Sequence, residues 1–263
     1  MKMKLILNIL KLKMWKKIKT LNNNEECINC LKILDDGRLA IGDDNSDLII
    51  FNFKTFKSDI IIKINLSSLC NFIQLNNKNI VCSFDSDNSL KIIKIKNNKE
   101  YEDIQIINNA HNNYITKIIE LKNENLITFS QDCYFKIWKL NNNNQYEKIS
   151  EFEDNNSLSD GLEIKDNEII LYAIDTNPKS LVFYNLNKKE KIKTINNLQL
   201  AINCLCKIIK INDNEVVVGE DGKVYLIDIN NYLSNYVKIR WNFIKKNLKQ
   251  SSILGTCMCK MAK

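Results

Sequence analysis

The chain has 263 residues, 44% of them hydrophobic, which is ordinary for a globular protein and predicts one large domain over 1–263. The N-terminal apolar stretch LILNIL (5–10) is too short to span a bilayer or to serve as an export signal, so we expect neither. The formal net charge of +7 is uneven, because the basic ends, 1–20 and 238–263, carry fourteen of the 38 Lys and Arg residues and no acid.

Five stretches along the chain share one pattern, in which an aliphatic residue, a polar turn of about four residues and a second aliphatic run follow one another. They are ILDDGRLAIG (33–42), QLNNKNIVCS (74–83), ELKNENLITF (120–129), EIKDNEIILY (163–172) and KINDNEVVVG (210–219). This pattern predicts a β-hairpin that is repeated five times.

A third alternating segment follows each hairpin. These segments are DLIIFNF (47–53), SLKIIKI (89–95), YFKIWKL (134–140), SLVFYNL (180–186) and KVYLIDI (223–229). If Phe51, Ile93, Trp138, Tyr184 and Ile227 are equivalent, the repeat lengths are 42, 45, 46 and 43. A fourth apolar segment, such as DIIIKIN (59–65) or EKIKTIN (190–196), completes most units.

Four short strands repeating every forty-odd residues are typical of a β-propeller blade, which buries its faces only by stacking around an axis. We therefore predict an all-β propeller of four-stranded blades. The predicted blade units are approximately 27–65, 69–108, 113–152, 158–196 and 201–241.

The two ends of the chain resemble parts of a blade. KLILNIL (4–10) aligns with the third segments, with Leu7 44 residues before Phe51, and WKKIKTL (15–21) fits a fourth strand. TCMCKM (256–261) resembles the first strand NCLCKI (203–208). We expect seam elements 4–21 and 251–263 to complete a composite sixth blade; an arc of a seven-bladed ring is the alternative.

The turns cannot rely on the usual turn residues, glycine and proline, because the chain has only six Gly and one Pro. Asparagine fills them in runs such as NNKN (76–79) and NDNE (212–215). Asparagine tolerates the left-handed backbone conformation and bonds to its own backbone, so we expect it to replace glycine here.

The repeats resemble WD repeats, whose units run from a Gly-His pair to a Trp-Asp pair, and the third unit is the best copy. Ala110-His111 stands at the Gly-His position, Asp132 in the turn between the second and third strands, and Trp138 at the tryptophan position. The resemblance implies a structural hydrogen-bond relay of His111, Ser130, Asp132 and Trp138, with Thr128 as an alternative hydroxyl to Ser130.

A Ser-His-Asp catalytic triad is the competing interpretation of SQDCYFKIW (130–138). No glycine flanks Ser130 to form the sharp turn that exposes a nucleophile, so we expect no catalytic residues. Nine cysteines and one histidine offer a single CxxC, Cys27 and Cys30, which is too little for a zinc site. We expect free thiols, no metal and no cofactor.

The resemblance implies a non-catalytic scaffold or adaptor in a larger complex. Nine cysteines without an export signal indicate a reducing compartment, so we expect a location inside the cell, in the cytoplasm or alternatively the nucleus. Its expected partners are proteins or peptides and not a small-molecule substrate. In the family the turns between second and third strands share one rim, so we predict an acidic partner-binding rim. Its candidates, with Asp132 on the same rim, are Asp43, Asp44, Asp85, Asp87, Asp175, Glu220 and Asp221.

Two alternatives remain. Some small propellers are glycoside hydrolases, which need carboxylates converging at the axis, and the inner strands here offer few. The basic ends could also contact nucleic acid or a membrane surface; the alternation in KLKM (11–14) fits a strand better than an amphipathic anchor, so we expect neither contact.

Overall fold

The computed structural model describes six stretches of the chain. They are residues 27–64, 66–173, 180–196, 207–220, 223–231 and 233–236. Within them no helix has the length and hydropathy to cross a membrane.

The described residues form twenty strands arranged in five antiparallel sheets of four, each sheet ordered as its strands occur in the chain. The first sheet has β1 (Ile28–Ile33), β2 (Leu39–Asp43), β3 (Asp47–Asn52) and β4 (Lys57–Lys63). The second has β5 (Leu69–Gln74), β6 (Ile80–Phe84), β7 (Leu90–Ile95) and β8 (Tyr101–Ile107). The third has β9 (Ile115–Glu120), β10 (Leu126–Ser130), β11 (Tyr134–Leu140) and β12 (Tyr146–Glu153).

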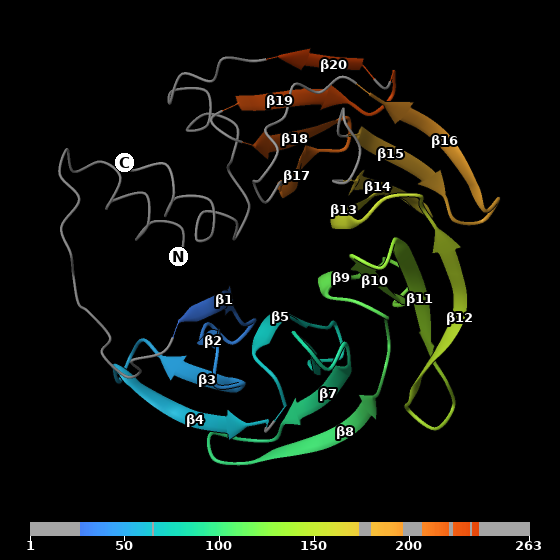
Figure 1. Ribbon diagram of the computed structural model, residues 1–263. Helices are drawn as coiled ribbons and strands as arrows, with labels where there is room; N and C mark the ends of the chain where they lie inside the picture. The colour runs from blue at the N-terminus through green and yellow to red at the C-terminus, as the bar shows by residue number, and fades with distance from the viewer. Residues whose placement is uncertain are drawn as a thin grey trace, which may run out of the picture.

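The fourth sheet has β13 (Leu158–Lys165), β14 (Glu168–Ala173), β15 (Ser180–Asn185) and β16 (Glu190–Ile195), and the fifth has β17 (Lys207–Asn212), β18 (Glu215–Glu220), β19 (Lys223–Asp228) and β20 (Leu233–Tyr236). The sheets follow one another around a common axis, with β1, β5, β9, β13 and β17 innermost and β4, β8, β12, β16 and β20 at the periphery (Figure 1). The predicted all-β propeller of four-stranded blades is confirmed. The predicted seam elements, 4–21 and 251–263, lie outside the described residues.

The strand register supports the predicted equivalence of the third strands. Phe51, Ile93, Trp138, Tyr184 and Ile227 each pair with the first aliphatic residue of the preceding strand. Those partners are Leu39, Ile80, Leu126, Ile169 and Val216. The repeat read from sequence spacing is therefore a structural repeat of the same register.

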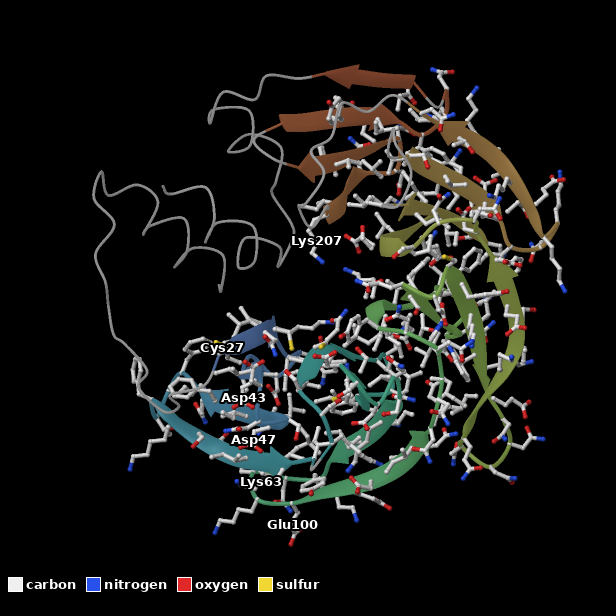
Figure 2. All side chains as sticks on the ribbon, viewed as in Figure 1. Cys27, Asp43, Asp47, Lys63, Glu100 and Lys207 are labelled. Atoms are coloured by element: carbon white, nitrogen blue, oxygen red, sulfur yellow. The ribbon has the colours of Figure 1, made fainter. Side chains whose placement is uncertain are left out.

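The hydrophobic core lies between the blades. Each junction from blade 1 to blade 5 has its own cluster of buried aliphatic and aromatic side chains drawn from both neighbours. Figure 2 shows these side chains filling the space between adjacent sheets. Apolar runs such as IVCSF in β6 are buried throughout because both of their faces meet another blade.

A polar contact repeats beside these cores, where a residue near the end of one inner strand accepts a backbone N–H from the first turn of the preceding blade. Gln74 accepts from Asp35, Glu120 from Asn76 and Glu163 from Lys122, at 2.8–2.9 Å. In blade 5 the equivalent residue, Lys210, donates to the carbonyl of Ile164 instead. We call this contact the interblade clamp.

Four of the five turns between first and second strands share one left-handed residue. Gly37, Lys78, Glu124 and Asn167 occupy the same place with φ values of 88°, 71°, 66° and 61°. Asparagine more often acts through its side chain: the amide oxygens of Asn77, Asn97, Asn123, Asn141 and Asn212 each accept a backbone N–H two residues on. Asparagine therefore replaces glycine in the left-handed conformation at some turns, as predicted, but at others it stabilises the turn through its side-chain hydrogen bond.

A β-bulge recurs in the outer strand of four blades. It lies opposite the equivalent third-strand residue, between Ile50 and Phe51, Ile92 and Ile93, Ile137 and Trp138, and Phe183 and Tyr184. One residue of the outer strand is left unpaired at each of these places, which are Asp59, Ile104, Ile149 and Ile192. Bulges increase the local twist of the strand that carries them.

Candidate functional site

A buried hydrogen-bond relay crosses blade 3 from its third strand to its entry loop. The indole N–H of Trp138 donates to Thr128 Oγ1 at 2.9 Å, and Thr128 Oγ1 lies 2.8 Å from His111 Nε2. His111 Nδ1 lies 2.9 Å from a carboxylate oxygen of Asp132. Asp132 also accepts the backbone N–H groups of Asn112 and Tyr134.

The partners determine how His111 carries its proton. Nδ1 faces a carboxylate and therefore donates, so Nε2 accepts the hydroxyl proton of Thr128. Burial lowers the pKa of His111 and outweighs the opposing effect of Asp132. Although burial acts against it, the hydrogen bonds from His111 and Asn112 lower the pKa of Asp132 to about 2. The relay therefore joins a neutral imidazole to an ionised carboxylate.

The expected role of Ser130 in this relay is wrong, because Thr128 takes that place. The Ser130 hydroxyl donates to the carbonyl of Asn113 at 3.1 Å and accepts the N–H of Asp132 at 3.0 Å. It holds the turn that presents Asp132. A Ser-His-Asp triad is not assembled, since this hydroxyl bonds to other groups and both Ser130 and His111 are at most 1% exposed.

Blade 4 contains a shorter relay that sequence inspection missed. Asp154 donates its N–H to the carbonyl of Cys133, as His111 does to the carbonyl of Asn88, so the two residues are equivalent. Tyr184, equivalent to Trp138, donates its hydroxyl to the Asp154 carboxylate at 3.0 Å. Burial, and then Asp154, raise the pKa of Tyr184, which keeps it a donor.

Lys191 completes this second relay. Its ammonium lies 2.7 Å from the carboxylate of Asp154 and 5.5 Å from the centre of the Tyr184 ring. The Asp154 carboxylate is fully buried and therefore needs these partners. The spacing in the sequence could have revealed that Asp154 is equivalent to His111. Asp154 precedes Leu158, the first residue of β13, by four residues, and His111 precedes Ile115, the first residue of β9, by the same interval.

Exposed polar groups lie at the turns between second and third strands and at the connections between blades 1, 2 and 3. Asp44 accepts Asn29 Nδ2 at 2.7 Å and the Ser68 hydroxyl at 2.8 Å, and these bonds lower its pKa. The backbone N–H of Asp85 donates to the carbonyl of Ser68, and the Asp85 carboxylate raises the pKa of Tyr114. We call Asn29, Asp44, Ser68, Asp85 and Tyr114 the inner-rim ladder.

The predicted acidic rim is assembled only in part. Asp44 and Asp87 are exposed, and Asp87 accepts the backbone N–H of Ser67 at 2.7 Å. The inclusion of Asp43 is wrong, because its side chain is buried inside blade 1, where it accepts the N–H groups of Asn45 and Asp47 (Figure 2). Asp175 and Asp221 lie outside the described residues, and Glu220 is described only as the last residue of β18.

The inner strands carry few carboxylates. Asp160 is fully buried and binds Lys117 Nζ at 3.2 Å and the N–H of Ile208 at 2.9 Å. Glu120 and Glu163 are occupied by the interblade clamp. In the described part of these strands the acids therefore connect blades and do not form a converging pair of the kind that glycoside hydrolysis requires.

Two thiols of the inner strands, those of Cys30 and Cys70, are held protonated by burial. Burial raises the pKa of Cys30 to about 12 and that of Cys70 to about 11, so neither forms a thiolate near neutral pH. Cys27, Cys30, Cys70, Cys82 and Cys133 are all free. Among these residues and the other described ligand types no cluster fits a metal ion.

The fold and the polar contacts place this chain in the class of β-propellers. Its buried relays and its interblade clamp connect strands, loops and neighbouring blades. Comparison with sequence-family models gives no match, and comparison with curated proteins gives none either. Among solved structures, a chain in the crystal structure of the mitotic checkpoint complex superimposes with a TM-score of 0.66 at 12% identity. The match covers 83% of this chain and 67% of that chain, and at this identity it establishes the fold alone.

Proposed function

We propose that this chain is a non-catalytic propeller of the WD-repeat type that presents its inner rim to a protein partner, as a scaffold or adaptor in a larger complex. The inner-rim ladder carries the proposal. It anchors polar side chains at the rim of blades 1 and 2 by short hydrogen bonds from Asn29 and Ser68 to Asp44, which limits the entropy lost on binding. The similarity to a chain of a multiprotein complex supports the same use of the fold.

The chemistry of the rim favours a basic segment in the partner. Asp44 and Asp87 are exposed carboxylates, and the pKa of Asp44 is lowered by its bonds to Asn29 and Ser68. The Tyr114 ring, 45% exposed, lies beside the Asp85 carboxylate and adds an aromatic face. Carboxylates next to an aromatic ring suit a lysine or arginine side chain.

Binding of lysine- and arginine-containing peptides to the whole protein tests this proposal. We expect Asp44→Asn with Asp87→Asn to weaken binding about tenfold and to reduce its dependence on salt, because two attractive charges are removed. Glu147→Gln, which removes an exposed charge from the outer strand β12, is the matched control. Binding that is insensitive to salt, or equally affected by Glu147→Gln, contradicts the proposal.

We also propose an intracellular location. The five described cysteines are free, and buried thiols such as Cys82 fit a reducing compartment. Measuring the fraction of modified thiols in protein taken rapidly from its source cell tests this, and extensive disulfide formation contradicts it.

A further inference from the structure

A hollow opens at the end of blade 1 opposite the inner-rim ladder, where the turns β1–β2 and β3–β4 meet the turn β7–β8 of blade 2. It has a volume of about 260 Å³, and its lining includes Arg38, Asn52, Asp59 and Asn98 together with Phe53, which is 45% exposed. We call it the lower-rim hollow. Sites for drug-sized ligands occupy roughly 300–1,000 Å³, so this hollow suits a smaller ligand of about one ring.

Two charged residues of the lower-rim hollow depart from the repeat. Arg38 immediately precedes the second strand, and Asp59 is the unpaired residue of the outer-strand bulge. At the first position the sister blades have Asn79, Asn125, Glu168 and Glu215. At the second position they have Ile104, Ile149 and Ile192. Since the other blades form without an arginine and a carboxylate at these places, the blade fold does not require this pair.

Arg38 is held in place, whereas Asp59 keeps unused hydrogen-bonding capacity. Arg38 Nε and Nη2 lie 2.8 and 2.7 Å from Asp36 Oδ2, and Nη1 lies 3.2 Å from Asn98 Oδ1. The Asp59 side chain is only 12% exposed, yet its contacts with described residues are long: 3.3 and 3.4 Å to Asn52 Nδ2 and 3.5 Å to Arg38 Nη1. Carboxylates in charge-assisted bonds accept at about 2.7–2.9 Å. A donor supplied by a ligand would therefore improve the environment of Asp59.

The charges of the lower-rim hollow favour a neutral ligand. Asp36 and Asp59 bring two carboxylates, and Arg38 and Lys54 bring two cations, so the lining is neutral as a whole. An anion would be repelled by both carboxylates, and a cation by the guanidinium and the ammonium. A neutral ligand that carries hydroxyl groups avoids both penalties, because one hydroxyl oxygen donates and accepts at the same time.

We propose that the lower-rim hollow binds a neutral polyhydroxylated ring of the size of one monosaccharide. Arg38 Nη1 and Asp59 Oδ2 are 3.5 Å apart, so one hydroxyl oxygen can lie about 2.8 Å from both, donating to the carboxylate and accepting from the guanidinium. The Phe53 side chain offers an apolar surface to the C–H face of the ring. A peptide group fits less well, since its N–H and C=O point in opposite directions and cannot bridge these two atoms.

Titration of the full-length chain with single neutral sugars tests this proposal. The probes are D-glucose, D-galactose, D-mannose, N-acetyl-D-glucosamine and myo-inositol, followed by saturation-transfer NMR on the sugar and by the amide shifts of Gly37 and Lys54. We expect at least one probe to bind with a dissociation constant on the order of 1 mM, and its amino or phosphorylated derivative to bind at least about tenfold more weakly. Absence of saturable binding by every probe overturns the proposal. Tighter binding of a phosphorylated derivative overturns it in favour of an anion site.

Substitutions locate the bound ring. Arg38→Lys keeps the charge but loses the planar fork, and Asp59→Ile introduces the residue type of the sister blades; each should weaken binding at least about tenfold. If either variant does not fold, Phe53→Ser, at an exposed ring, gives the same comparison. Unchanged binding in the folded variants overturns the proposal.

Two controls remove charges elsewhere. Glu147→Gln acts on the outer strand β12, and Asp44→Asn with Asp87→Asn acts on the opposite rim. Both should leave sugar binding unchanged, and an equal loss in either of them contradicts a site in the lower-rim hollow. Since the second control removes the charges on which the proposed peptide binding depends, failure of one proposal is distinguishable from failure of the other.

Discussion

Trp138 donates its indole N–H to the hydroxyl of Thr128, which lies on the same sheet face two residues before Ser130. The threonine hydroxyl is fully buried and also contacts His111. One oxygen therefore connects the third strand of blade 3 to the loop that enters it.

Removal of this hydroxyl should destabilise the fold. Thr128→Val keeps the shape of the side chain but leaves the indole N–H and His111 Nε2 without partners, so we expect a loss of about 2–3 kcal/mol in the free energy of unfolding. Thr194→Val, at an exposed threonine of β16, is the matched control and should change it by less than about 0.5 kcal/mol. Equal effects of the two substitutions in urea unfolding would show that the relay contributes nothing.

The same relay predicts how stability depends on pH. Burial lowers the pKa of His111 below its usual 6.5, so the unfolded chain takes up a proton first as the pH falls. The free energy of unfolding should therefore decrease as the pH falls below about 6.5. A second decrease should follow between about 4 and 2, where Asp132, whose pKa is about 2, loses its charge.

His111→Gln separates the loss of stability below about pH 6.5 from the loss between about pH 4 and 2. It removes the chain's single histidine, so the decrease near pH 6 should disappear while the variant is less stable at pH 8. An unchanged slope between pH 5 and 6.5 would assign the dependence to other groups.

The blade 4 relay should be equally sensitive to its donor. Tyr184→Phe removes the hydroxyl that bonds to the buried carboxylate of Asp154, and we expect a loss of about 1.5–3 kcal/mol. Tyr101→Phe, at a tyrosine 36% exposed in β8, should be nearly neutral. Thermal unfolding followed by circular dichroism compares the two. Restoration of stability by Asp154→Asn in the Tyr184→Phe background would support the charge as the cause.

Close packing of blades 3 and 4 should make Gly161 intolerant of a side chain. A Cβ at this position of β13 would overlap the ring of Phe129. We expect Gly161→Ala to cost about 1–3 kcal/mol, because the ring belongs to a packed interblade core. Phe129→Leu should reduce the additional cost of Gly161→Ala, and additive losses in the double variant would show that the two residues do not conflict.

The repeat could be predicted because each blade uses the same register. Spacing alone identified Phe51, Ile93 and Trp138 as equivalent, and their pairing partners are equivalent too. Alternation could not choose between Thr128 and Ser130, since both lie on one face of β10. The choice follows from the cross-strand register, in which Trp138 lies opposite Leu126, two residues from Thr128.

Side-chain contacts made by turns and entry loops could not be read from the sequence. The burial of Asp43 depends on the turn folding its carboxylate toward Asn45 and Asp47. The bond from Tyr184 to Asp154 joins residues thirty positions apart, one in the third strand of blade 4 and one in the loop that enters it, and Leu171 stands where blade 3 has Thr128. These contacts depend on how the turns and loops fold, whereas the sequence pattern reports on the strands.

The bulge that recurs in the outer strands bears on the pairing of exposed strand edges with other chains. Each outer strand leaves one edge of its blade open, and strands rich in isoleucine, such as β4 (KSDIIIK), are good templates for pairing with another chain. A bulge opposite Phe51, Ile93, Trp138 and Tyr184 interrupts the straight ladder that an incoming strand would need. The same irregularity in four outer strands is therefore expected to hinder their edge-to-edge pairing with another chain.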